Sequence, residues 1–269
     1  MKDLWIRLGM DPNSKDTWTQ WPINLPPRNH FDLPEFAPRV WAAICELVGG
    51  EDRLRPSCRD WSDALVVNLG SATHEGKQVT HKDLKSWHVD GDAFVHYLDS
   101  PEQSVLIIPL FTDVLHNGGP TIICPERLKK VPKRLFDHPE GASPDLFPCG
   151  HVYFREEGHT GWADNAAATS KEVVEATGKV GDVYLLHPLM LHTTSRNELR
   201  HVRVIANPSA IMKEPDRLYR TDGNHSLVER KTIRAFLKPA RVRIMEQMEK
   251  EAEERSALMS PSNETTDNA

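Results

Sequence analysis

The sequence has no long apolar run, few cysteines and no surplus of basic residues, and each absence excludes a class of protein. No stretch reaches the roughly 18 consecutive apolar residues of a membrane-spanning helix, so we expect no membrane partner. Lys and Arg, 33 in all, are outnumbered by 39 Asp and Glu, and the net charge of −6 argues against nucleic acid as a partner. The four cysteines form no Cys-x-x-Cys pair, and the N-terminus lacks a secretory signal pattern, so we expect a cytoplasmic protein.

From residue 61 onward, the sequence consists of short apolar runs bounded by Gly, Pro, Asn and Asp. The runs predict strands at 64–69, 94–98, 104–111, 121–123, 179–186 and 202–205. They are not separated by the regular helices that a parallel α/β sheet requires. We therefore predict a mainly β protein with a sandwich or barrel core.

Helical patterns flank this core on both sides. Apolar residues recur at helical spacing over 35–48, and Gly49 follows as a helix stop. Near the other end, Ser226 and Glu229 have the spacing of a capping box, which predicts a helix start.

The remaining segments have no clear periodicity. The first thirty-odd residues are rich in proline and predict an extended segment, and 129–168 predicts an irregular insertion of the kind that forms a lid or binding loop. We expect a single domain over residues 1–255 and a disordered tail, with these bounds: core 61–210, helical flanks 34–50 and 226–255, tail 256–269.

Three residues have the pattern of a metal site. On a strand, His88 and Asp90 point to the same side, while the residue between them turns away. An imidazole and a carboxylate side by side are two ligands of the 2-His-1-carboxylate triad that holds non-haem Fe(II). The third ligand is expected on a later strand, where His187 and His192 are five residues apart and face opposite sides. Spacing to a following arginine favours His192.

That arginine is Arg203, eleven residues after His192 and inside an apolar run. A guanidinium there is costly to bury unless it meets an anion, and its planar fork suits a carboxylate. An iron site with a dicarboxylate beside it indicates 2-oxoglutarate.

These residues resemble the motifs of the phytanoyl-CoA dioxygenase (PhyH-like) family: His88-x-Asp90, the distal His192, Arg203, and an Asn-Gly turn at Asn117-Gly118-Gly119-Pro120-Thr121. The resemblance implies a double-stranded β-helix (jelly-roll, cupin-like) core. It implies a dioxygenase that uses Fe(II), 2-oxoglutarate and O2 to oxidise a C–H bond of a small organic molecule. The outcome would be hydroxylation, desaturation or oxidative ring closure, with release of succinate and CO2. Thr121 would then hydrogen-bond a carboxylate of 2-oxoglutarate.

Further side chains are candidates for the pocket. Thr194, two residues after the distal histidine, could assist the arginine. His96 has the strand parity of the aspartate and could line the substrate pocket, while Trp162 could close over substrate from the irregular insertion. Asp92 is a rival carboxylate ligand, although a solvated turn after Gly91 is the simpler interpretation.

Three other functions remain open at this point. A cupin-like enzyme could use a metal such as zinc without 2-oxoglutarate. A jelly-roll binding protein could be non-catalytic, with purely structural histidines. A protein-modifying oxygenase of the Jumonji type shares the His-x-Asp…His pattern but commonly anchors 2-oxoglutarate with lysine. The favoured partner is a small-molecule substrate.

Overall fold

Short apolar runs fold into antiparallel strands that form four small sheets. The computed structural model describes residues 2–19, 22–156, 158–220 and 222–236. The sheets have the strand orders β1-β4-β10, β11-β5-β8, β7-β6-β9 and β2-β3, and the pairs within them are antiparallel. The strands are β1 (Ile23–Leu25), β2 (His30–Asp32), β3 (Asp60–Ser62), β4 (Leu65–Asn68), β5 (Val105–Pro109), β6 (Thr121–Ile123), β7 (Val174–Glu175), β8 (Val183–Leu186), β9 (His192–Thr194), β10 (Arg203–Ile205) and β11 (Ser209–Ala210).

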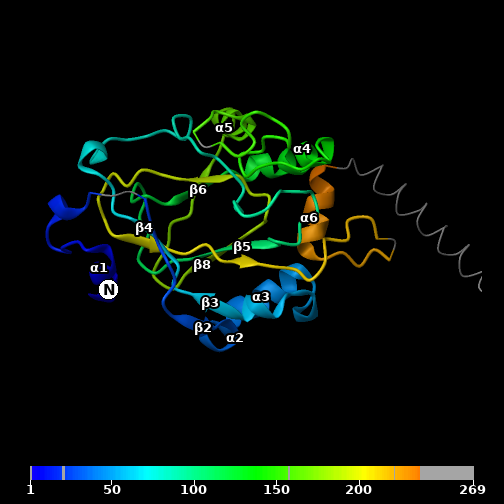
Figure 1. The fold of residues 1–269 in the computed structure, drawn as a ribbon, viewed down its shortest axis with the longest axis horizontal. Coiled ribbons are helices and arrows are strands. Elements are labelled where there is room, and N and C mark those ends of the chain that lie inside the picture. The colour runs from blue at the N-terminus through cyan, green and yellow to red at the C-terminus, as the bar shows by residue number, and fades with distance from the viewer. Residues whose placement is uncertain (1, 20–21, 157, 221, 237–269) are drawn as a thin grey trace, which may run out of the picture.

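Helices surround these sheets and make up about 27% of the structure, so the fold is mixed rather than mainly β. In Figure 1 the strands lie between α2 and α3 on one side and α4 and α5 on the other, with α6 at one end. The α-helices are α1 (Lys2–Leu8), α2 (Leu33–Phe36), α3 (Pro38–Val48), α4 (Val131–Asp137), α5 (Trp162–Ala168) and α6 (Leu227–Phe236). Antiparallel strands with flanking helices are thus confirmed.

Strand β5 is buried on both of its faces because it lies between a helix and the interior of the sheets. Val105 and Ile107 face outward and share a hydrophobic cluster with Ile44 of α3. Leu106 and Ile108 face the opposite side and belong to a second cluster. Burying an apolar side chain of this size contributes roughly 1.5–3 kcal/mol. Packing on both faces therefore fixes the sheet relative to α3.

Both helix signals found in the sequence are confirmed. Helix α3 ends at Gly49, whose φ of +88° is left-handed and whose amide donates to the carbonyl oxygens of Cys45 and Glu46. Before α6, the amide of Glu229 donates to Ser226 Oγ at 3.1 Å, and the amide of Ser226 donates to Glu229 Oε2 at 2.7 Å. These reciprocal bonds are a capping box.

Three local expectations differ from the structure. The N-terminal segment contains α1 because proline is absent before Pro12, so the proline-rich composition of the whole segment hid a helix. The insertion 129–168 contains α4 and α5, and Pro132 is tolerated because it occupies the first turn of α4. Residues 94–98 form no strand; His96 makes one isolated bridge to Ala142. The expected helix and tail beyond residue 236 lie outside the described residues.

Within the described part of the chain, no helix combines the length and apolar character that a membrane crossing needs.

Asp216 is a buried carboxyl group that makes stability depend on pH. Burial, and then the charge of Glu229, raises its pKa from 3.8 to about 7 against the opposing effect of Arg53. The unfolded chain therefore loses this proton near pH 4, whereas the folded protein keeps it until about pH 7. As the pH rises through this interval, the free energy of unfolding falls. Above about pH 7 the full cost of the buried charge of Asp216 is present.

We expect Asp216→Asn to remove this cost, because an amide does not ionise. At pH 8 the variant should exceed the wild type by up to about 4 kcal/mol in free energy of unfolding, and the gain should shrink below pH 5. Urea unfolding at pH 8 and at a pH below 5 measures the difference in free energy of unfolding between the variant and the wild type. Asp113→Asn, which changes an exposed aspartate, is the control. An equal difference at the two pH values would contradict the assignment.

Candidate metal centre

Backbone pairing brings two distant segments of the chain together. The amide of His88 donates to the carbonyl oxygen of His192 at 3.0 Å, and the amide of His192 donates back to the carbonyl oxygen of His88 at 3.0 Å. This isolated antiparallel bridge places the two imidazole rings side by side, with 4.5 Å between their centroids. Val89 is fully buried, as strand alternation predicts.

The two rings and one carboxylate converge on a single point. One potential ligand atom from each of His88, Asp90 and His192 lies within 4.8 Å of the other two. Asp90 Oδ1 is 3.4 Å from Nε2 of both histidines. Two imidazoles and one carboxylate form a donor set suited to a divalent transition metal. The structure therefore brings the three sequence-predicted ligands together.

Each ligand is oriented by a hydrogen bond at its other end. Nδ1 of His88 is 2.6 Å from the carbonyl oxygen of Ser86, and Nδ1 of His192 is 2.9 Å from that of Met190. A carbonyl oxygen can only accept, so both rings carry a proton on Nδ1, and Nε2 is the nitrogen that faces the shared point. Asn207 Nδ2 donates to Asp90 Oδ2 at 3.2 Å and leaves Oδ1 for the metal. Such supporting contacts orient metal ligands.

The electrostatics of this cluster favour positive charge. Burial acts to raise the pKa of Asp90, but His192 and His88 outweigh it and hold that pKa far below its usual value. Burial acts to lower the pKa of His88, but its hydrogen bond and charge interaction with Asp90 raise it to about 8. The carboxylate therefore stays ionised, and the cluster is suited to a cation.

Arg203 is a buried cation without a carboxylate partner among the described residues. It is 1% exposed, and burial lowers its pKa to about 10, so the guanidinium stays charged at neutral pH. Its Nη2 donates to Thr121 Oγ1 at 3.1 Å, which links β10 to β6 in a different sheet. Nε and Nη1 are buried, and no described residue accepts a hydrogen bond from either of them. Because a buried charge is costly without compensation, these two donors point to an absent anion.

The threonines lie on the same face as the distal histidine. Thr194 is two residues after His192 on β9, and its Cα partner on β6 is Thr121. Paired residues of neighbouring strands share a face, so both hydroxyl groups lie on the side of His192. Arg203 reaches that face through its bond to Thr121.

The structure separates the other candidates. His187 bonds Thr232 of α6 at 3.0 Å and lies outside the cluster, which favours His192 as the distal ligand. His96 is buried, with Nε2 3.1 Å from the carbonyl oxygen of Gly91, and it lines a small cavity together with Asp90. Trp162 carries the guanidinium of Arg134 over its ring at 5.3 Å and lines a separate pocket.

A cavity of about 870 Å³ opens beside His88. Its wall includes Lys85, Asp92 and Asp164, together with residues 143–145 and parts of 154–160. This volume suits a small organic molecule. Most of these wall residues, and Asn207, were missed by sequence reasoning, because they reach the site through tertiary packing. Of these residues, Asn207 could have been predicted from the sequence, because it follows Arg203 by four residues and so has the same strand parity.

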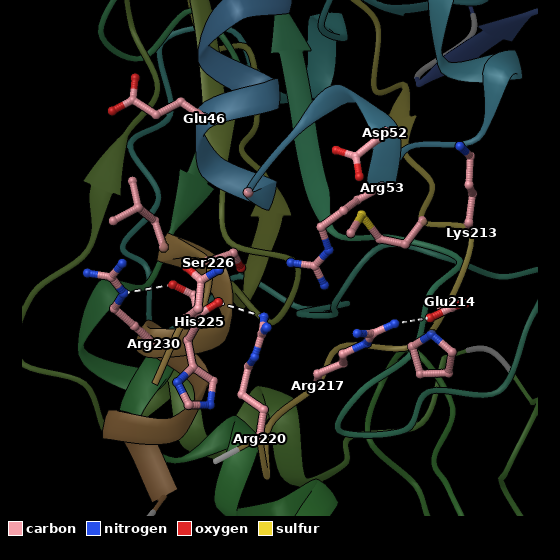
Figure 2. Close-up of a pocket in the computed structure, with 15 residues that line it drawn as sticks. Glu46, Asp52, Arg53, Lys213, Glu214, Arg217, Arg220, His225, Ser226 and Arg230 are labelled. Carbon is pink, nitrogen blue, oxygen red and sulfur yellow. Dashed lines mark hydrogen bonds and ion pairs between the residues drawn. The ribbon is translucent and has the colours of Figure 1, made fainter. Parts of the chain in front are cut away.

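A second cavity, of about 610 Å³, lies between α3 and the start of α6 and shares no lining residue with the first. Figure 2 shows its cationic side chains, of which Arg217 pairs with Glu214 at 2.6 Å. Arg220 pairs with Asp222, and Arg53 with the buried Glu229. Three of its four arginines are thus paired with carboxylates, in contrast to Arg203, and the fourth, Arg230, donates to the carbonyl oxygen of His225.

Comparison with known proteins gives no family assignment. The chain matches no protein family and no curated protein. The site is therefore interpreted from its own geometry.

We expect Asn207→Ala to weaken metal binding by roughly 10- to 100-fold, the usual effect of removing a contact that orients a ligand. Anaerobic calorimetric titration with Fe(II) measures the affinity. The exposed Asn13→Ala provides a matched control and should bind like the wild type. Unchanged affinity in Asn207→Ala would show that the Asp90 carboxylate needs no support from Asn207.

Proposed function

We propose that the protein is an Fe(II)- and 2-oxoglutarate-dependent oxygenase that oxidises a C–H bond of a small organic molecule. The convergence of His88, Asp90 and His192, with the buried unpaired Arg203, is the observation that carries the proposal. It also supports the finer fold assignment, a double-stranded β-helix related to the PhyH-like family. In that fold the ligands and the arginine face one interior.

The residues fit the implied groups. Two imidazole nitrogens and one carboxylate oxygen would hold iron(II) and would leave it able to bind a co-substrate and O2. Either Nε or Nη1 of Arg203, together with the second hydrogen of Nη2, forms a planar fork of two donors, which matches the distal carboxylate of 2-oxoglutarate. Thr121 and Thr194 add hydroxyl groups beside it. When bound, iron(II) with 2-oxoglutarate and O2 supplies the oxidising power that removes hydrogen from carbon, with release of succinate and CO2.

The chain's own residues supply binding and orientation. His88, Asp90 and His192 would hold the metal in a fixed direction because the opposite end of each side chain is already hydrogen-bonded. Arg203 would bind the distal carboxylate of the co-substrate and so orient it. The cavity beside His88 would hold the substrate close to the metal.

Anaerobic protein with Fe(II) and 2-oxoglutarate should develop a weak visible charge-transfer band. We expect His88→Ala and Asp90→Ala to lose it, because two remaining ligands do not hold the metal. The exposed His116→Ala, a matched histidine control, should keep the band. Metal binding without a band would favour a cupin-like enzyme that does not use 2-oxoglutarate, and no metal binding would favour a non-catalytic protein.

Arg203→Met tests the co-substrate site separately from the metal site. We expect Fe(II) binding to persist and the dissociation constant for 2-oxoglutarate to rise at least about 100-fold, since two charge-assisted hydrogen bonds contribute roughly 1.5–3 kcal/mol each. The melting temperature without 2-oxoglutarate should be equal or higher, because a buried unpaired charge is removed.

The exposed Arg39→Met is the control for both measurements. Unchanged 2-oxoglutarate affinity, or a large loss of stability in Arg203→Met, would show that the arginine is structural instead.

A further inference from the structure

Carboxylates outnumber permanent cations in the wall of the cavity beside His88. Among its lining residues are four carboxylates and two permanent cations: Asp92, Asp145, Glu156 and Asp164 against Lys85 and Arg155. These charges decide which substrates the cavity admits, because a mismatched charge would lose its hydration without compensation.

The less exposed charges of this wall are the negative ones. Asp164 is 7% exposed and lies in the first turn of α5. Its Oδ1 accepts a hydrogen bond from the amide of Trp87 at 3.1 Å, and its Oδ2 receives none from the described residues. Asp145 is partly buried and follows Pro144, whose carbonyl oxygen accepts the amide of Val89 at 3.0 Å. Both aspartates are therefore held against the segment that carries His88.

The cations lie on the solvent side. Lys85 and Arg155 are both exposed, and the guanidinium of Arg155 lies 5.5 Å from the ring centre of its neighbour Phe154. Exposed charges are screened by water and salt, so they compensate the buried Asp164 weakly.

A loaded metal centre would not reverse this excess. The charges of iron(II) and Arg203 balance those of Asp90 and the 2-oxoglutarate dianion. The field that a substrate meets in the cavity is then set by its wall, and a cation is the complementary ligand.

We propose that the substrate carries a positively charged nitrogen, a protonated amine or guanidinium group, which binds Asp164. The carbon to be oxidised would then lie toward His88. This inference rests on the proposed function for the reaction, but the binding preference can be measured without it.

The test compares primary amines with alcohols and carboxylic acids that share the same short aliphatic and aromatic skeletons. Saturation-transfer NMR on the full chain, with no iron or 2-oxoglutarate added, should show binding of the amines as a class. The same amines should perturb the charge-transfer band of the anaerobic Fe(II)–2-oxoglutarate protein and stimulate 2-oxoglutarate consumption.

Asp164→Asn keeps an oxygen for the amide of Trp87 and removes the charge, so it should fold and bind the amines about tenfold or more weakly. The exposed Asp113→Asn, outside the cavity, should bind them like the wild type. Equal or absent binding of the three compound sets, or a preference for acids, overturns the inference. A normal charge-transfer band without a preference for amines would contradict this inference but not the oxygenase proposal. Binding of amines without a charge-transfer band would contradict only the oxygenase proposal.

Discussion

The candidate site depends on one pair of backbone hydrogen bonds, between His88 and His192. The two residues are far apart in the sequence, and this reciprocal bridge fixes their separation before any metal is present. Hydrogen bonds of the side chains then orient the ligands. Backbone carbonyl oxygens accept from Nδ1 of both histidines, and Asn207 donates to Oδ2 of Asp90. The three free ligand atoms therefore face one another because their alternatives are already occupied, and little conformational entropy remains to be lost on metal binding.

Charge is distributed in a way that packing alone does not explain. Other little-exposed arginines among the described residues meet a carboxylate, as where Arg53 meets Glu229 and Arg7 meets Asp63. Arg203 is 1% exposed, and its one hydrogen bond to a described residue is to the hydroxyl group of Thr121. The buried charge of Arg203 costs stability, and binding of an anion offsets this cost. The same burial that penalises the free guanidinium strengthens its hydrogen bonds to a carboxylate.

Much of this site follows from the sequence because it depends on local rules. Strand alternation puts His88 and Asp90 on one side, parity separates His187 from His192, and an arginine in an apolar run indicates a buried charge. The capping box at Ser226 is equally local. The cavity wall could not be predicted from the sequence. Asp164 reaches the site from α5 and Asp145 from a turn, and both lie in an insertion whose sequence has no periodicity. The expected strand at 94–98 failed because β structure needs a partner, and His96 finds only a single bridge. Whether the sheets form a jelly roll stays a prediction.

Anomalous diffraction at the iron edge, from anaerobic crystals grown with Fe(II) and 2-oxoglutarate, tests the central claim most directly. We predict one iron peak in contact with Nε2 of His88, Nε2 of His192 and Oδ1 of Asp90, and 2-oxoglutarate with its distal carboxylate against Arg203. An iron peak held by other residues, or a 2-oxoglutarate molecule that leaves Nε and Nη1 of Arg203 without a partner, would contradict the account.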